Sequence, residues 1–165
     1  MLNQLLRRAV VPSLIVLTSF LVTFAIIRAI TFLIRVGIGP FHNVTAGGVH
    51  IHHMFWGILI LLAVGYLVLV PLGSLQTPIP RWISCVTAGV YGIGSALTLD
   101  EFALWLHFRD VYWESQGFAS IDAAAVFVAM VAISIWGGPI LAARASELVR
   151  AARAKVQLRL VRSAS

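Results

Sequence analysis

Four long apolar runs, each close to the length needed to cross a lipid bilayer, constrain this chain more than any other feature. The first, Val10 to Ile27, holds no charged residue and at about 1.5 Å per residue nearly spans a hydrocarbon core of about 30 Å. The others extend from about His50 to Val70, from about Trp82 into Asp100, and from about Ala119 to Leu141. With 60% hydrophobic and 11% charged residues, a soluble domain would be covered in apolar surface. The sequence therefore predicts an all-α fold, a polytopic membrane bundle of four helices.

Lysine and arginine are unevenly distributed about these runs, and basic loops are retained in the cytoplasm. With four spans, nine of the 12 basic residues fall on the side of both termini, whereas Arg28, Arg35 and Arg109 fall on or towards the other side. This predicts that both termini are cytoplasmic. All five histidines and five of the six acids lie between His42 and Asp122, so we expect them to gather at the exterior end.

The segment 144–165 is basic, with apolar residues at helical spacing. We expect it to form a cytoplasmic or membrane-surface helix, separate from a four-span domain of residues 1–143. Topology and attraction to anionic lipid explain the net charge of +6, and no aromatic or glycine motif accompanies the tail to indicate nucleic acid. The expected partners are membrane lipids, and a membrane-protein partner or a second copy of the chain stays open.

Small residues recur at helical spacing on two of the expected spans, and in lipid such stripes let helices approach closely. The third-span stripe ends at an acid and the fourth-span stripe begins with one, so we expect both acids to point inward. The stripes consist of Ala88, Gly92, Ala96 and Asp100, and of Asp122, Ala125, Ala129 and Ala132.

Histidines 50, 52 and 53 surround the expected start of the second span. In a helix His50 and His53 lie about 60° apart, whereas His52 turns away. On a continuous third helix, Asp100 and His107 share a face. Imidazoles and carboxylates are common ligands for zinc and iron. The predicted ligands of a divalent metal ion are His50, His53, Asp100, His107 and Asp122, with Glu101 or Asp100 as the catalytic acid or base.

Two other interpretations of this polar cluster stay open. A hydrogen-bond network without a metal would satisfy the same residues. The other interpretation is a haem group held by His53 and His107. It is the weakest of the three interpretations, because the neighbouring carboxylates suit a harder metal ion than haem iron.

Arg28 and Arg35 are seven residues apart, hence on one helix face near the outer end of the first span. A guanidinium suits carboxylates and phosphates. In one interpretation Arg28 pairs with Asp100, Glu101 or Asp122, and Arg35 reaches the lipid headgroups. In the other, the two arginines hold a phosphate-bearing headgroup beside the histidines and acids.

Several of these motifs resemble a group of uncharacterised bacterial integral membrane proteins. The resemblance covers roughly residues 45 to 130 and implies a multi-pass protein of the bacterial plasma membrane, without implying an activity. The motifs that carry it are His50–His53, Leu99–His107, Asp110–Trp113 and Ser120–Ala123.

More distantly, the chain is similar to the VanZ-like membrane proteins, some of which are linked to glycopeptide resistance. In that resemblance a histidine opens one span, a glutamate ends the next and an aspartate opens the last, which corresponds to His53, Glu101 and Asp122 here. The chain has Val49 to His52 in place of the family's Asp-Lys pair, and it lacks the glutamine after the glutamate.

Two classes of function follow from these patterns. The first is a membrane enzyme, metal-assisted, that acts on a lipid or lipid-linked headgroup at the outer leaflet, where a metal would polarise a phosphoryl or acyl oxygen. The second is a non-enzymatic subunit of a membrane complex or a small transporter, whose polar cluster only fixes helix packing. No nucleotide-binding loop is present in the sequence.

Overall fold

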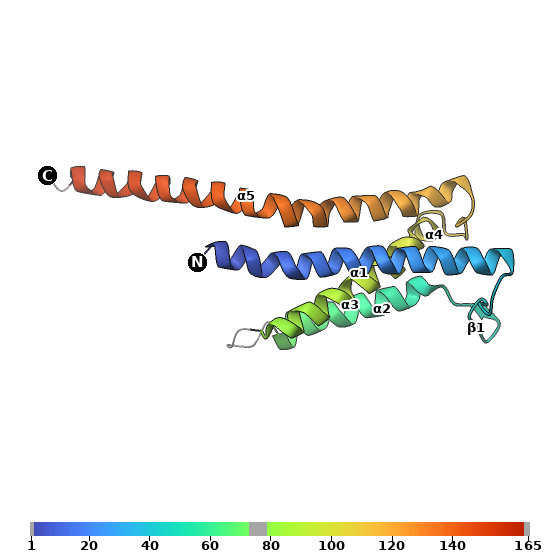
Figure 1. The fold of residues 1–165 in the computed structure, drawn as a ribbon. Helices are drawn as coiled ribbons and strands as arrows, with labels where there is room; N and C mark the ends of the chain where they lie inside the picture. Colours follow the sequence, from blue (N-terminus) through green and yellow to red (C-terminus); the bar gives the residue numbers. More distant parts are fainter. Residues whose placement is uncertain (1, 73–78, 164–165) are drawn as a thin grey trace.

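The computed structural model describes residues 2–72 and 79–163, and this part of the chain is mostly helical (Figure 1). Four of its helical segments are long and apolar enough to cross a membrane: Val10–Val36, His53–Val70, Arg81–Asp100 and Ser115–Gly138. The prediction of a helical chain with four such segments is therefore confirmed. The helices are α1 (Leu2–Val36), α2 (His53–Leu67), the π-helical turn η1 (Val68–Leu72), α3 (Arg81–Asp100), α4 (Phe102–His107), the 3-10 turn η2 (Ser115–Gly117) and α5 (Phe118–Ser163).

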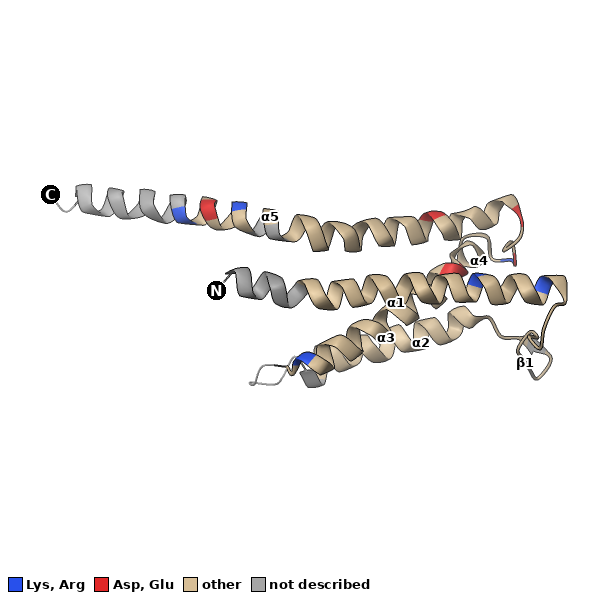
Figure 2. Cartoon of the chain, in the orientation of Figure 1, with Lys and Arg blue, Asp and Glu red and all other residues tan. Residues whose placement is uncertain are grey.

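The four long helices run so that both ends of the chain lie at one end of the molecule (Figure 1). The opposite end carries α4 and a short antiparallel hairpin of β1 (Thr45–Ala46) and β2 (Val49–His50). Most of the coloured charges lie towards the two ends, and long uncharged stretches of helix separate them (Figure 2). The chain therefore has an apolar middle and two polar ends.

Helix α3 is central, because among the described elements it contacts α1, α2 and α5. Its stripe of Ala88, Gly92, Ala96 and Asp100 is buried, as expected from small residues at helical spacing. A side chain at Gly92 would meet the Ser19 hydroxyl and the Val16 carbonyl oxygen of α1. Glycine is thus required where α3 and α1 come closest.

The fourth-span stripe does not face inward, contrary to expectation. Asp122, Ala125 and Ala129 are exposed, and α5 instead buries the face that includes Ser120 and Ala124. This face gains more apolar contact, because Ala124 packs on Phe20 and Ala96, and Phe127 lies with its ring 4.6 Å from that of Phe20. Helix α5 also continues without a break through the expected domain boundary at residues 143 and 144.

Two helix boundaries near the polar end differ from the sequence prediction. The expected continuous third helix is interrupted at Glu101, whose φ of −109° and ψ of 22° leave the helical region. Helix α4 then restarts, and the hydroxyl of Ser120 accepts a hydrogen bond of 3.0 Å from the Ala103 N–H, one of the donors that a helix start leaves unpaired.

The second span begins at His53 and not at His50. Gly47 and Gly48 have φ values of 59° and 80°, the positive angles that a tight hairpin turn requires. This turn folds the chain back and pairs His50 with Thr45 in the hairpin. His50 therefore lies on a strand, outside the helix on which it was expected to share a face with His53.

Candidate functional site

A fully buried carboxylate, Asp100, lies at the end of α3 and joins three other segments of the chain. Its Oδ1 accepts a hydrogen bond of 2.5 Å from Arg28 Nε on α1. Its Oδ2 lies 3.0 Å from His53 Nε2 on α2 and accepts a hydrogen bond of 2.8 Å from the Tyr112 hydroxyl. We call Arg28, His53, Asp100 and Tyr112 the Asp100 cluster. Its partners satisfy an acid that is 0% exposed, which burial alone would destabilise.

Tyr112 closes this cluster from the loop that follows α4. Its hydroxyl also pairs with the Thr31 hydroxyl at 2.9 Å, and its ring lies 4.4 Å from the Arg28 guanidinium carbon, a cation–π contact. Burial, and then the charge of Asp100, raise the pKa of the Tyr112 hydroxyl above its ordinary value. The hydroxyl therefore stays protonated and serves as a donor to Asp100.

The neighbouring acid, Glu101, is 7% exposed and holds the start of α2. Its Oε2 accepts a hydrogen bond of 3.0 Å from the Met54 N–H, and its Oε1 lies 2.7 Å from His52 Nδ1. A carboxylate at a helix N-terminus pairs a free N–H and complements the helix dipole. Because a carboxylate oxygen accepts, His52 Nδ1 is the donor of this hydrogen bond. In the tautomer with its proton on Nδ1, Nε2 is the acceptor.

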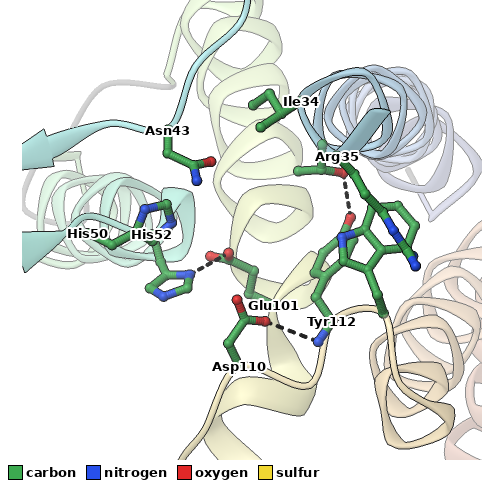
Figure 3. Close-up of a pocket in the computed structure, with 10 residues that line it drawn as sticks. Ile34, Arg35, Asn43, His50, His52, Glu101, Asp110 and Tyr112 are labelled. Atoms are coloured by element: carbon green, nitrogen blue, oxygen red, sulfur yellow. Dashed lines mark hydrogen bonds and ion pairs between the residues drawn. The ribbon is translucent and has the colours of Figure 1, made fainter. Parts of the chain in front are cut away.

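A cavity of about 620 Å³ opens beside these groups. Arg35 lies on one side of it, with its guanidinium carbon 4.6 Å from the centre of the Trp113 ring. His50 and His52 lie on the other side, and Glu101 and Asp110 lie between (Figure 3). The full lining is Thr31, Ile34, Arg35, Asn43, His50, His52, Glu101, Asp110, Tyr112 and Trp113. Such a volume is in the range of small-molecule sites.

The structure brings together only part of the predicted metal site. His53 and Asp100 are in contact, but His50 is exposed on β2, His107 is exposed at the end of α4 and Asp122 is exposed on α5. Within residues 2–72 and 79–163, no group of three or more His, Cys, Asp or Glu side chains is placed to hold a metal ion. The other three predicted ligands lie apart from this pair. The helix breaks at Glu101 before His107, the hairpin removes His50 from α2, and α5 buries a face that does not include Asp122.

Sequence reasoning missed His52, Asp110 and Tyr112 as site residues. The Gly47-Gly48 pair was the available signal for His52, since a hairpin turn there delays the start of the helix and leaves His52 at its N-cap. No local sequence pattern connects Tyr112 with Asp100. Only the return of the loop after α4 makes that contact.

The chain is therefore a helical protein in which four helices are long and apolar enough to span a membrane. A polar cavity lies at one end of these helices. No family model matches the chain, and neither a curated protein nor a solved structure matches it.

Proposed function

We propose that this chain is a multi-pass membrane protein that binds the phosphate-bearing headgroup of a lipid or lipid-linked molecule in the cavity beside Glu101, and acts on it. The observation that carries the proposal is a cavity of about 620 Å³ at one end of four apolar helices. It combines a guanidinium that has no ion pair among the described residues with a histidine–carboxylate pair. A headgroup would reach this cavity from the adjoining leaflet.

The orientation belongs to the same proposal. Basic residues coloured blue lie at the start of α3 and on the C-terminal half of α5, towards the end that carries the termini (Figure 2), and basic residues favour the cytoplasmic side. With that end inside the cell, the cavity faces the outer leaflet of a bacterial plasma membrane. The sequence resemblance supports the choice of membrane.

Arg35 is the group that suits a phosphate. Its guanidinium rests on the Trp113 ring, and in the described part of the chain it has neither an ion pair nor a hydrogen bond. A guanidinium offers several donors in a planar fork that matches phosphate oxygens. Arg28 lacks this freedom, because Asp100 already holds it.

The His52–Glu101 pair supplies acid–base chemistry. Glu101 orients the ring through Nδ1, so Nε2 can take a proton from a water molecule whose oxygen attacks the phosphorus of a phosphodiester. The phosphorus–oxygen bond to the leaving group then breaks, and the proton on Nε2 passes to the departing alkoxide oxygen. Asp100 positions the helix ends, since protein groups already occupy both its carboxylate oxygens.

The test uses purified full-length protein in phospholipid–detergent micelles, with bound lipid measured by native mass spectrometry and hydrolysis by release of water-soluble product. We expect Arg35→Gln to weaken binding and Arg109→Gln to leave it unchanged, because Arg109 lies at the same end but pairs with Glu114 at 3.0 Å. His52→Gln should keep lipid binding and lower turnover by about 100-fold or more. His42→Gln, at a residue outside the cavity lining, should leave both binding and turnover unchanged. Equal binding by wild type and Arg35→Gln would contradict the proposal.

A non-enzymatic role is the second candidate, and a specific observation favours it. Every member of the Asp100 cluster is bonded within the protein, as a network that fixes helix packing would be. Wild-type protein that binds lipid without releasing product would support this role.

The metal-assisted form of the reaction is a separate proposal. Elemental analysis of the detergent-purified protein, with an absorption spectrum, tests it directly. Zinc or iron in stoichiometric amount would support it. Metal-free protein that retains full turnover would contradict it.

A further inference from the structure

We propose that the headgroup taken by this cavity carries a primary ammonium beside its phosphate, as an ethanolamine phosphodiester does. The inference rests on the proposed function and specifies the substrate class of the same site. It is carried by the charges on the cavity wall, which are of both signs and are separated in space (Figure 3).

The negative side of the cavity has an unused acceptor. Asp110 lines the cavity, and its Oδ1 accepts a hydrogen bond of 3.1 Å from the Tyr112 N–H. Its Oδ2 has no hydrogen-bond or ion-pair partner among residues 2–72 and 79–163. Glu101 differs, because His52 and the Met54 N–H occupy both its oxygens. The free carboxylate oxygen of Asp110 is therefore the acceptor left for a cationic group.

The two free charges suit a ligand that carries the opposite pair. A phosphate on Arg35 places the rest of the headgroup towards Asp110 and Glu101, which lie between Arg35 and His52 in the close-up (Figure 3). A purely anionic headgroup would meet these carboxylates without a compensating charge. A primary ammonium donates a hydrogen bond to the remaining Asp110 oxygen, whereas a quaternary ammonium has no N–H to donate.

The test compares three phospholipids with identical acyl chains, carrying ethanolamine, choline or glycerol on the phosphate. Binding to full-length protein in detergent micelles is measured by native mass spectrometry. We expect the ethanolamine lipid to bind about tenfold more tightly than the other two, the ratio that the loss of one charge-assisted hydrogen bond produces. Stepwise N-methylation of that lipid should lower its binding progressively.

Asp110→Asn should remove the preference for the ethanolamine lipid, because the ammonium loses its charged acceptor. The asparagine carbonyl can still accept from the Tyr112 N–H, so the loop keeps its contact. The matched control is Glu114→Gln, because Glu114 is an acid of the same loop that lies outside the cavity lining and pairs with Arg109. This control should preserve the preference.

Two further outcomes separate the inference from the function on which it rests. Tight binding of all three lipids alike, lost together in Arg35→Gln, would overturn the ammonium inference and leave the proposed function standing. Binding that is indifferent to Arg35→Gln would overturn both. Competition by soluble phosphoethanolamine distinguishes a site for the free headgroup from one that also requires the lipid.

Discussion

At the residue scale, the unusual feature is a buried cluster of ionisable side chains at the end of apolar helices. Asp100 is fully buried, and Arg28 and His53 keep only 23% and 21% of their side chains exposed. A buried charge is stable only when paired and hydrogen-bonded. The cluster thus acts as a unit, in which each member depends on the others.

Replacement of Asp100 should show this dependence. Asp100→Ala leaves the Arg28 guanidinium and His53 without their carboxylate, and loss of one partner of a buried pair costs about 3–5 kcal/mol. The free energy of unfolding, measured with denaturant in detergent, should fall by about that amount. Asp122→Ala is the control, since Asp122 is exposed and the change should stay within about 0.5 kcal/mol. Similar losses in the two variants would contradict this account.

At the element scale, α3 organises the bundle because two of its faces are built for close approach. Gly92 admits α1, and Gly94 meets Gly57 of α2, where an added Cβ would lie 3.2 Å from the Gly57 carbonyl oxygen. Without a hydrophobic driving force in lipid, such backbone contact is what holds helices together. The same packing brings Arg28 and His53 to the end of α3.

Gly92→Val should separate α1 from α3. The new side chain meets the Val16 carbonyl oxygen and the Phe20 N–H of α1, backbone atoms that cannot move aside, and overpacking typically costs about 1–3 kcal/mol. We expect a lower thermal unfolding temperature in detergent. Gly65→Val is the matched control, because no atom lies within 4 Å of a Cβ placed there. An undiminished unfolding temperature in Gly92→Val would show that the close approach is unimportant.

At the scale of the whole molecule, the chain is divided into two unlike ends. The cavity and the histidines lie at the end with α4 and the hairpin, whereas the chain termini lie at the other end (Figure 1). Any action on a headgroup therefore depends on which side of a membrane each end occupies.

Cysteine labelling in cells tests that orientation. In a Cys85→Ser background, Asn43→Cys and Gln116→Cys should react with an impermeant thiol reagent from outside. Gln76→Cys, which lies outside the described residues, and Leu160→Cys should react only after permeabilisation, because basic residues favour the cytoplasmic side. The reverse pattern would place the cavity in the cytoplasm and remove the outer-leaflet site.

Local pattern was sufficient for some features of the site and insufficient for others. One of the two interpretations of Arg28 paired it with an acid on a later helix. The observed ion pair with Asp100 agrees with the cost of an unpaired charge near the membrane interior. The inward direction of Asp122 was wrong, because a stripe of small residues does not say which of two faces packs better. Helix α5 buries Ala124 and brings Phe127 against Phe20.

The sequence by itself determined the class of fold and the gathering of polar residues at one end, because uncharged runs of spanning length leave few alternatives to membrane helices. Only the tertiary structure decided which polar residues meet. The Glu101 break, the Gly47-Gly48 turn and the returning loop bring His52 to Glu101 and Tyr112 to Asp100. These contacts join residues 49 and 12 positions apart, and helical periodicity carries no information about how one segment turns back onto another.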